Sequence, residues 1–307
     1  MQMYQKLNNG NSVPVLGLGT WESEKNLVGS AVKFAIAQAG YRHIDCASIY
    51  GNEKEIGEVL TNVVNTAVKR EELFITSKLW NTDHRPEHVE EACKKTLWDL
   101  RLEYLDLYLM HWGIAFRHRG DSEQFDEHGK IITDAVSIQE TWQAMEDLVK
   151  KGLVRSIGVS NFTTTMLLDL FTYAKVKPTM NQIELHPYNT QTELVDFCKY
   201  KHVAVTAYSP LGRQGVKTVK GPKLFDEPII KAVAEKHKRT PAQVLLNWAI
   251  NRGTIAIPKS VIPEQIAENI EVFDFELVDE EKAEINSLNR NHRFVNPAAW
   301  WGIPYFA

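Results

Sequence analysis

Short apolar runs alternate with amphipathic segments along nearly all of the 307 residues. Eight such runs are short and aliphatic, as strands buried on both faces of a parallel sheet should be. They span residues 15–18, 43–44, 74–77, 105–110, 156–159, 180–183, 203–207 and 254–257. Eight strand–helix units in about 250 residues is the size of a (β/α)8 TIM barrel. A doubly wound α/β sheet is the main alternative, but nothing divides the chain, so we predict one barrel domain over residues 1–307.

Helix signals lie between these runs. Residues 56–64 and 89–100 each carry an apolar stripe with helical spacing. The segment Thr240-Pro241-Ala242-Gln243 combines a capping Thr, a Pro at the first helical position and a Gln three residues after the cap. It predicts a helix that begins at this point and buries the apolar residues that follow.

Further segments predict features outside the strand–helix units. Residues 4–13 indicate an N-terminal β-hairpin that turns at Asn9-Gly10 and covers the closed end of the barrel. Long aperiodic segments occupy residues 113–133 and 212–227 and the tail from residue 291. We expect them to be functional loops at the C-terminal face of the barrel.

Charge and cysteine content exclude several classes of function. A net charge of −4 offers no basic surface for nucleic acid or an anionic membrane. Cys46, Cys93 and Cys198 are odd in number and far apart, so no disulfide is expected. With no apolar leader or spanning run, we expect a reduced, soluble, cytoplasmic protein. His84 and His88 are four residues apart without a third ligand, so we predict no metal site.

Ionisable side chains collect just past the apolar runs, where the strands of a barrel place active sites. Four of these side chains are Asp45, Tyr50, Lys78 and His111, and each has an ordinary structural explanation when taken alone. Burying all four at the same end of the barrel would cost free energy, which favours a functional role for the group. An ammonium beside a phenol favours phenolate, so Lys78 should lower the pKa of Tyr50 from about 10 towards neutral pH. The four residues predict protonation of an oxygen that gains negative charge, with His111 orienting it.

Five segments resemble a known family. Residues 41–53 (YRHIDCASIYGNE) and 257–260 (IPKS) are similar to two signatures of the aldo-keto reductases. Residues 158–162 (GVSNF), 181–188 (NQIELHPY) and 207–212 (AYSPLG) are similar to its other hallmark segments, in order and with the family's spacing. The chain resembles aldose reductase-like and xylose reductase-like members in particular. The resemblance implies NAD(P)H-dependent reduction of aldehydes, and also of ketones and aldoses, to alcohols.

The resemblance also implies roles for single residues. Asp45, Tyr50, Lys78 and His111 match the catalytic tetrad, with Tyr50 as general acid in reduction. The implied cofactor-binding residues are Gly19, Thr20, Trp21, Asp45, Ser160, Asn161, Gln182, Tyr208, Ser209, Leu211, Lys259, Ser260, Gln265, Glu268 and Asn269. Along this series, residues 160, 161 and 182 would hold the nicotinamide amide, 208 would stack on its ring, and 209 and 211 would clasp the diphosphate. Residues 259 and 260 would hold the 2′-phosphate of NADPH, and 268 and 269 the adenine.

Three positions depart from the family pattern. Ile262 and Gln265 stand where aldose reductase-like members usually carry Thr and Arg, and that Arg lies against the 2′-phosphate. The loss of a charge-assisted hydrogen bond worth about 1.5–3 kcal/mol lowers the preference for NADPH over NADH by about 10- to 100-fold. We therefore expect NADPH to be preferred through Lys259, with NADH tolerated better than usual. Gly113 replaces a common Pro and should loosen the start of the first long loop.

Aromatic residues are expected, by family analogy, to line the mouth together with His111. They are Trp21, Trp80, Trp112, Phe116, Trp300 and Trp301. Such a pocket favours aromatic and medium aliphatic aldehydes over small polar sugars. The expected partner is therefore a small carbonyl compound, and the family leaves open a monomer or a homodimer. Two other functions remain open: a catalytically weak, cofactor-sensing barrel that acts as a binding or regulatory subunit, and a barrel aldolase or isomerase.

Overall fold

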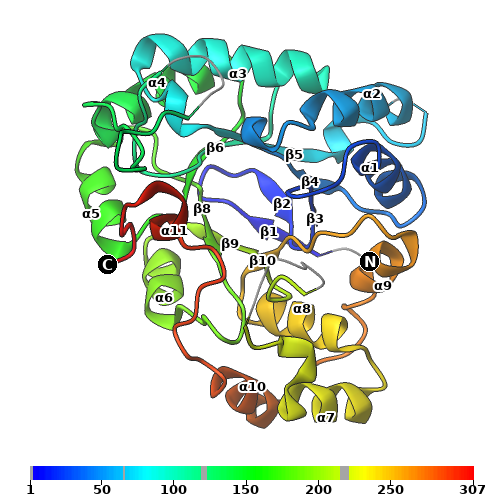
Figure 1. Ribbon diagram of the computed structural model, residues 1–307. Helices are drawn as coiled ribbons and strands as arrows, with labels where there is room; N and C mark the ends of the chain where they lie inside the picture. The colour runs from blue at the N-terminus through cyan, green and yellow to red at the C-terminus, as the bar shows by residue number, and fades with distance from the viewer. Residues whose placement is uncertain (1–2, 65, 119–122, 215–220) are drawn as a thin grey trace.

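The computed structural model describes residues 3–64, 66–118, 123–214 and 221–307. Eight parallel strands form a ring with helices around it, which confirms the predicted (β/α)8 barrel (Figure 1). The strands are β3 (Leu18–Gly19), β4 (His43–Asp45), β5 (Phe74–Leu79), β6 (Leu107–Met110), β7 (Ile157–Ser160), β8 (Met180–Glu184), β9 (Ala204–Tyr208) and β10 (Ile255–Ala256). Nearly all of their residues are buried, which explains why the runs are continuously apolar.

The ring closes between its first and last strands. Leu16 bridges Ala256, and Gly19 bridges Lys259, both in parallel register. Glycine is required here because the backbones approach closely: a Cβ on Gly19 would lie 2.9 Å from the carbonyl oxygen of Ile257. This close approach of two backbones explains why residue 19 is a glycine.

Helices cover the outside of the ring. They are α1 (Val28–Ala37), α2 (Glu53–Val63), α3 (Pro86–Leu100), α4 (Ile138–Lys150), α5 (Thr164–Tyr173), α6 (Thr192–Tyr200), α8 (Pro241–Asn251) and α9 (Pro263–Ile270), with α7 (Pro228–His237), α10 (Asp279–Asn286) and α11 (Pro297–Trp301) in addition. The predicted capping box begins α8: the Thr240 hydroxyl accepts from the Gln243 amide, and the Gln243 side chain accepts from the Thr240 amide. No helix among the described residues is long and apolar enough to cross a membrane.

The N-terminal hairpin covers the N-terminal end of the barrel, as predicted. Strands β1 (Tyr4–Lys6) and β2 (Ser12–Pro14) pair antiparallel, and Gly10 turns between them with φ of 91°. Leu7 and Val13 are buried against the first residues of several barrel strands, among them Phe74 of β5. Figure 1 shows the hairpin in the middle of the ring. The opposite, C-terminal end is therefore the open one.

Each strand differs from its predicted run by one to three residues at one end or both. Only Leu18 of the run 15–18 belongs to a barrel strand, whereas Leu16 joins the ring by an isolated bridge to Ala256. Strand β5 continues to Leu79, so Lys78 lies within the strand and not after it. Periodicity could not show this, because a buried lysine looks like the end of an apolar run.

The predicted long loops lie at the open end. In the first loop, Phe116 bridges Thr133 and Phe125 bridges Ile131. Residues 119–122 of this loop and 215–220 of the second lie outside the described residues. The tail carries α11, and Figure 1 shows α11 in front of the strands at the open end of the ring.

Candidate active site

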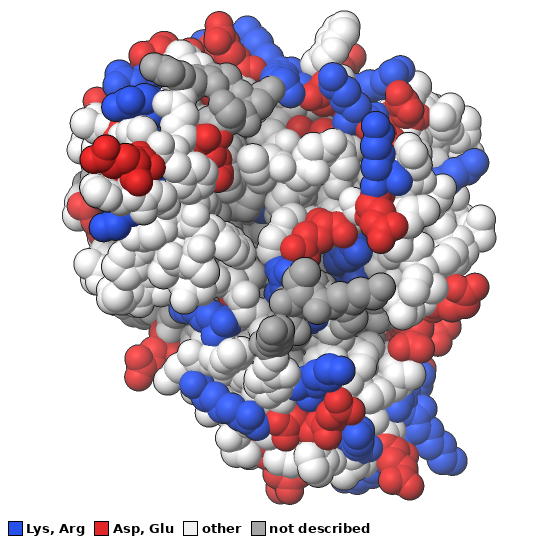
Figure 2. All heavy atoms as spheres, viewed as in Figure 1, with Lys and Arg blue, Asp and Glu red and all other residues white. Residues whose placement is uncertain are grey.

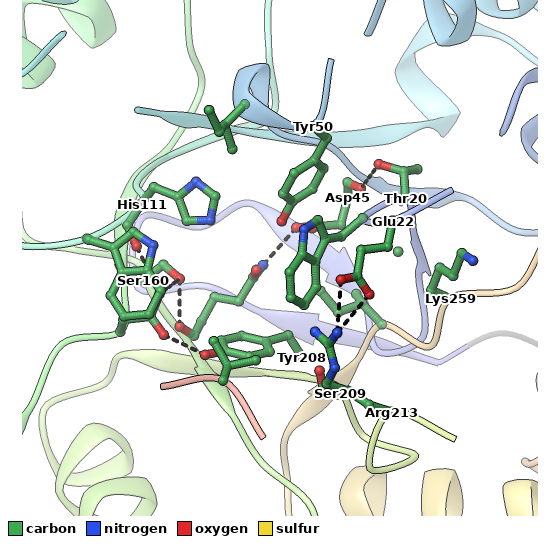
Figure 3. A pocket seen from close by; sticks show the side chains of 18 of the residues that line it. Thr20, Glu22, Asp45, Tyr50, His111, Ser160, Tyr208, Ser209, Arg213 and Lys259 are labelled. Atoms are coloured by element: carbon green, nitrogen blue, oxygen red, sulfur yellow. Dashed lines mark hydrogen bonds and ion pairs between the residues drawn. The ribbon is translucent and has the colours of Figure 1, made fainter. Parts of the chain in front are cut away.

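Four ionisable side chains meet at the open end of the barrel, and three of them, Asp45, Tyr50 and His111, are labelled in Figure 3. Asp45 ends β4, Tyr50 ends the following 3-10 turn, Lys78 lies in β5, and His111 directly follows β6. These strands are neighbours in the sheet, and parallel strands end at the same edge. The structure therefore brings all four residues of the predicted tetrad together.

Lys78 is fully buried and is fixed by three hydrogen bonds. Its ammonium donates to Asp45 Oδ1 at 2.6 Å, to the carbonyl oxygen of Cys46 at 2.8 Å and to Tyr50 Oη at 3.2 Å. Burial by itself lowers the pKa of Lys78, but the Asp45 carboxylate and Tyr50 raise it above its usual value. Asp45 is held in turn by Gln182 Nε2, which donates to its Oδ2 at 2.7 Å. Lys78 is thus a fixed cation away from water.

The expected lowering of the Tyr50 pKa is wrong. Burial raises the pKa of Tyr50 to about 12, although the ammonium of Lys78 acts in the opposite direction. Sequence reasoning counted the charged neighbour and missed the loss of solvent, which is the larger effect. The phenol is consequently protonated at neutral pH. It can give a proton to a bound oxygen, and Lys78 can stabilise the phenolate that remains.

His111 is neutral. Burial, followed by the charge of Lys78, lowers the pKa of His111 well below its usual value. Its ring packs edge-on against Trp80, with 5.0 Å between centroids, and lies 5.9 Å from the ring of Tyr50. A neutral imidazole can donate one hydrogen bond to a carbonyl oxygen without taking the proton that Tyr50 provides.

A polar wall stands beside the tetrad. Asn161 follows β7 with φ of 62°, and its Nδ2 donates to the carbonyl oxygen of His111 at 3.0 Å. Its Oδ1 accepts from the Tyr208 hydroxyl at 2.8 Å. Ser160 Oγ donates to the carbonyl oxygen of Gln182 at 2.9 Å. These bonds fix the amide, hydroxyl and aromatic groups of the wall before any ligand arrives.

Asp45, Tyr50 and His111 line one cavity together with this wall, whereas Lys78 is hydrogen-bonded to Asp45 and Tyr50 from outside the lining. The cavity has a volume of about 340 Å³, a size that suits a small molecule. Eleven of the predicted cofactor-binding residues line it: Gly19, Thr20, Trp21, Asp45, Ser160, Asn161, Gln182, Tyr208, Ser209, Leu211 and Lys259. The other four do not: Ser260, Gln265, Glu268 and Asn269. They lie beyond Lys259, in the loop after β10 and in α9.

Of the four predicted residues that do not line the cavity, Ser260, Gln265 and Glu268 form side-chain hydrogen bonds within the protein. Ser260 Oγ donates to Gln265 Oε1 at 2.8 Å, and Thr240 Oγ1 donates to Glu268 Oε1 at 2.7 Å. Lys259 is exposed, and none of the ion pairs found in the described parts of the chain includes it. Its ammonium is therefore available to an anion, whereas Gln265 offers no charge.

An ion pair that the sequence prediction missed crosses the cavity. Arg213 Nη2 donates to both carboxylate oxygens of Glu22, each at 2.9 Å, and its guanidinium lies 4.4 Å above the ring of Trp21 (Figure 3). Arg213 Nε and Nη1 are buried without a partner in the described residues. Arginine donors are rarely left unpaired when buried, so these two favour an anionic ligand. The only sequence signal was the position of Arg213 in the second long loop.

The predicted aromatic residues gather on the cavity wall near the tetrad. Trp21, Trp80, His111, Trp112, Trp300 and Trp301 all line the cavity. Phe116 does not, and this expectation is wrong: it packs behind the wall, with its ring 4.8 Å from that of Trp301. Glu123 and Val295 line the cavity and were not predicted. Both lie in the long loops, where no periodic pattern indicates which way a side chain points.

A buried carboxylate positions the tail. Glu184, at the end of β8, accepts the backbone N–H groups of Phe294 at 2.7 Å and Val295 at 3.0 Å. It also pairs with His186 Nε2 at 2.8 Å. The barrel thereby fixes the start of the tail, which continues into the two tryptophans of α11.

Gly113 does not loosen the first loop, contrary to expectation. Its backbone N–H donates to the hydroxyl of Tyr305 at 2.9 Å, and the Tyr305 ring packs edge-on against Trp112. A proline here would have no N–H to donate. A Cβ would also lie 2.1 Å from the Met166 side chain. The glycine therefore ties the loop to the tail.

A (β/α)8 barrel with a buried Asp–Lys–Tyr group and a neutral His at its C-terminal mouth defines an enzyme that protonates a substrate oxygen. The chain belongs to the aldo/keto reductase family, whose model matches residues 15–290, and it is an oxidoreductase. Aldo-keto reductase family 1 member A1 is 50% identical over 295 residues in Sus scrofa and 51% over 296 in Bos taurus. Each match covers 95% of this chain and 90% of the relative.

A solved structure is similar over almost the whole chain. The aldose reductase of Schistosoma japonicum has a TM-score of 0.92 and 46% sequence identity, and the match covers 99% of this chain and 98% of that one. The comparisons thus confirm the family and the barrel that the sequence predicted, and with them NAD(P)H-dependent carbonyl reduction.

Proposed function

We propose that this chain reduces aldehydes to alcohols with NADPH as the preferred cofactor and Tyr50 as the proton donor. The observation that carries the proposal is the hydrogen bond of 3.2 Å between the buried ammonium of Lys78 and Tyr50 Oη. A neutral phenol held against a fixed cation can release a proton to an oxygen that is becoming negative.

The cofactor supplies a hydride to the carbonyl carbon, and the chain's own residues manage the proton. His111 donates a hydrogen bond that orients the carbonyl oxygen towards Tyr50. Tyr50 transfers its hydroxyl proton to that oxygen, and the phenolate is stabilised by Lys78. Asp45 keeps Lys78 charged in a site that would otherwise favour the neutral amine.

The cavity suits a dinucleotide. Ser160, Asn161 and Gln182 offer amide and hydroxyl groups beside the tetrad, and Tyr208 offers a ring to stack on the nicotinamide. The unpartnered donors of Arg213 suit the diphosphate, a double anion that must lie on this side if the nicotinamide lies by Tyr50. These roles extend the diphosphate contacts expected of Ser209 and Leu211.

Preference for NADPH is proposed to rest on Lys259. The exposed Lys259 ammonium can pair with the 2′-phosphate, but Gln265 is neutral and hydrogen-bonded to Ser260. The preference for NADPH over NADH should therefore be moderate. We expect kcat/KM to favour NADPH over NADH by about 10- to 100-fold, and a ratio above about a thousandfold would show that NADH is not tolerated.

Replacement of Tyr50 by Phe tests the chemical assignment. The loss of a general acid should lower kcat by about 10²- to 10⁴-fold with 4-nitrobenzaldehyde, while the Kd of NADPH measured by calorimetry stays nearly constant. Tyr200→Phe, at an exposed position on α6, is the matched control. Full activity in Tyr50→Phe would refute the role of Tyr50. A wild-type protein that binds NADPH but oxidises none of it with any aldehyde would favour a regulatory barrel instead.

A further inference from the structure

Charge is unevenly distributed along the cavity. Among the described residues, the basic side chains on its wall are Arg213 and Lys259, from the loops after β9 and β10. In Figure 3 Lys259 lies on the opposite side of Asp45 from His111, and Arg213 lies below Asp45, away from His111. Arg213 and Lys259 therefore face the cofactor side and not the region in front of His111, where the substrate must lie.

Among the described residues, Glu123 is an acidic side chain on the cavity wall that belongs to the aromatic end. Glu123 comes from the first long loop, is half-buried and lines the cavity. Unlike Asp45, it is not bound to a lysine: none of the ion pairs within the described ranges includes it. Burial raises the pKa of Glu123 and a hydrogen bond from the Trp301 side chain lowers it, with a net rise.

Trp301 connects Glu123 to the reacting end of the cavity. The Trp301 side chain is buried, and its ring lies 5.1 Å from Trp112 and 6.1 Å from Trp80. Trp80 in turn contacts His111, with 5.0 Å between ring centroids. Because an indole has a single donor, Trp301 directs that donor at Glu123 and holds the carboxylate on the same wall.

We propose that Glu123 is a specificity-determining residue, which selects aldehydes that carry a hydrogen-bond donor or a positive charge beyond the carbonyl and disfavours aldehydes that carry a carboxylate. The inference rests on the proposed function and names a substrate class for the same site. A carboxylate on an otherwise apolar wall attracts donors and repels anions, and both effects are strong where little water screens them. The basic residues at the other end of the cavity are reserved for the phosphates of the cofactor.

The test uses three benzaldehydes with different para substituents: neutral nitro, anionic carboxylate and cationic trimethylammonium. Glu123→Gln keeps the shape of the side chain and removes its charge. The ratio of kcat/KM between variant and wild type cancels the electronic effect of each substituent on the ring. We expect this ratio to rise about tenfold for the carboxylate, to fall about tenfold for the ammonium compound and to stay within about twofold for the nitro compound.

Glu127→Gln is the matched control. Glu127 lies in the same loop with its side chain 87% exposed and does not line the cavity. Its removal should leave all three ratios near one. A parallel change of the three ratios in Glu123→Gln, or none at all, would overturn the inference.

If the wild-type protein does not reduce the nitro compound either, the proposed function fails; if it does and the charged compounds respond alike, only the role of Glu123 fails.

Discussion

Replacing Arg213 by Met should weaken cofactor binding, and the geometry of this residue sets the size of the effect. Its side chain is 8% exposed, and among the described residues only Glu22 binds its guanidinium, through one of the three nitrogens. Methionine can keep the contact with Trp21 but has no donor. One lost charge-assisted hydrogen bond to a phosphate costs about 1.5–3 kcal/mol, so the Kd of NADPH should rise about 10- to 150-fold.

The partner residue separates two explanations of this ion pair. If Arg213 binds the diphosphate, Glu22→Gln removes a competing anion and should tighten cofactor binding. Glu22 is 41% exposed, so screening limits the gain to about two- to fivefold. If the pair acts only as a clasp between two loops, both variants should weaken binding.

Isothermal titration calorimetry with NADPH and no aldehyde measures the two Kd values independently of turnover. Opposite changes in Arg213→Met and Glu22→Gln would support a diphosphate contact. A weakening of similar size in both variants, or an unchanged Kd in Arg213→Met, would refute the reasoning. Figure 2 shows basic and acidic side chains mixed across this face, so removal of one charge should not alter the attraction of NADPH at long range.

Two further predictions concern stability and reactivity. Burial raises the pKa of Glu53 to about 7, against hydrogen bonds from Ser77 and Thr96, so the folded state binds more protons than the unfolded state between about pH 4.5 and 7. The contribution of Glu53 to stability is present at low pH and is lost as pH rises through about 7. In urea titrations, Glu53→Gln should therefore reduce the fall in unfolding free energy between pH 5 and pH 8 by about 2–3 kcal/mol. Glu58→Gln, at an exposed position, should not. All three cysteines are free and buried, and burial raises the pKa of Cys93 to about 12 and of Cys198 to about 11. An aromatic disulfide reagent at pH 8 should thus label thiols only after denaturation, and rapid labelling of the native protein would contradict the burial.

Much of the barrel and its catalytic group could be predicted from the sequence because both depend on local patterns. Short aliphatic runs locate strands, and the residue after a run lies at the open end wherever the helix crossovers keep the strands parallel. Asp45 and His111 follow from this rule, and the family segments added Ser160, Asn161 and Gln182. The capping box at Thr240 needed four residues only.

The direction of the Tyr50 pKa shift could not be predicted from local patterns. The charged neighbour was visible in the sequence, but the depth of burial was not, and burial decides the direction of the shift. The same holds for Lys78, which lies inside a strand and not at its end. Solvent exclusion is a property of the packed barrel, so no local pattern contains it.

Loop contacts are the other part that only the tertiary structure decided. Arg213 meets Glu22 across 191 residues, Tyr305 meets Gly113 across 192, and Trp301 brings Glu123 to the cavity wall. Loops beyond the strand ends have no repeating pattern, and their partners are chosen by how distant segments pack over the mouth. The sequence by itself determined the barrel, its open end and the four residues that meet there. Packing decided which charged side chains line the cavity and which are paired, because charge pairing depends on distances in space that separation along the chain does not encode.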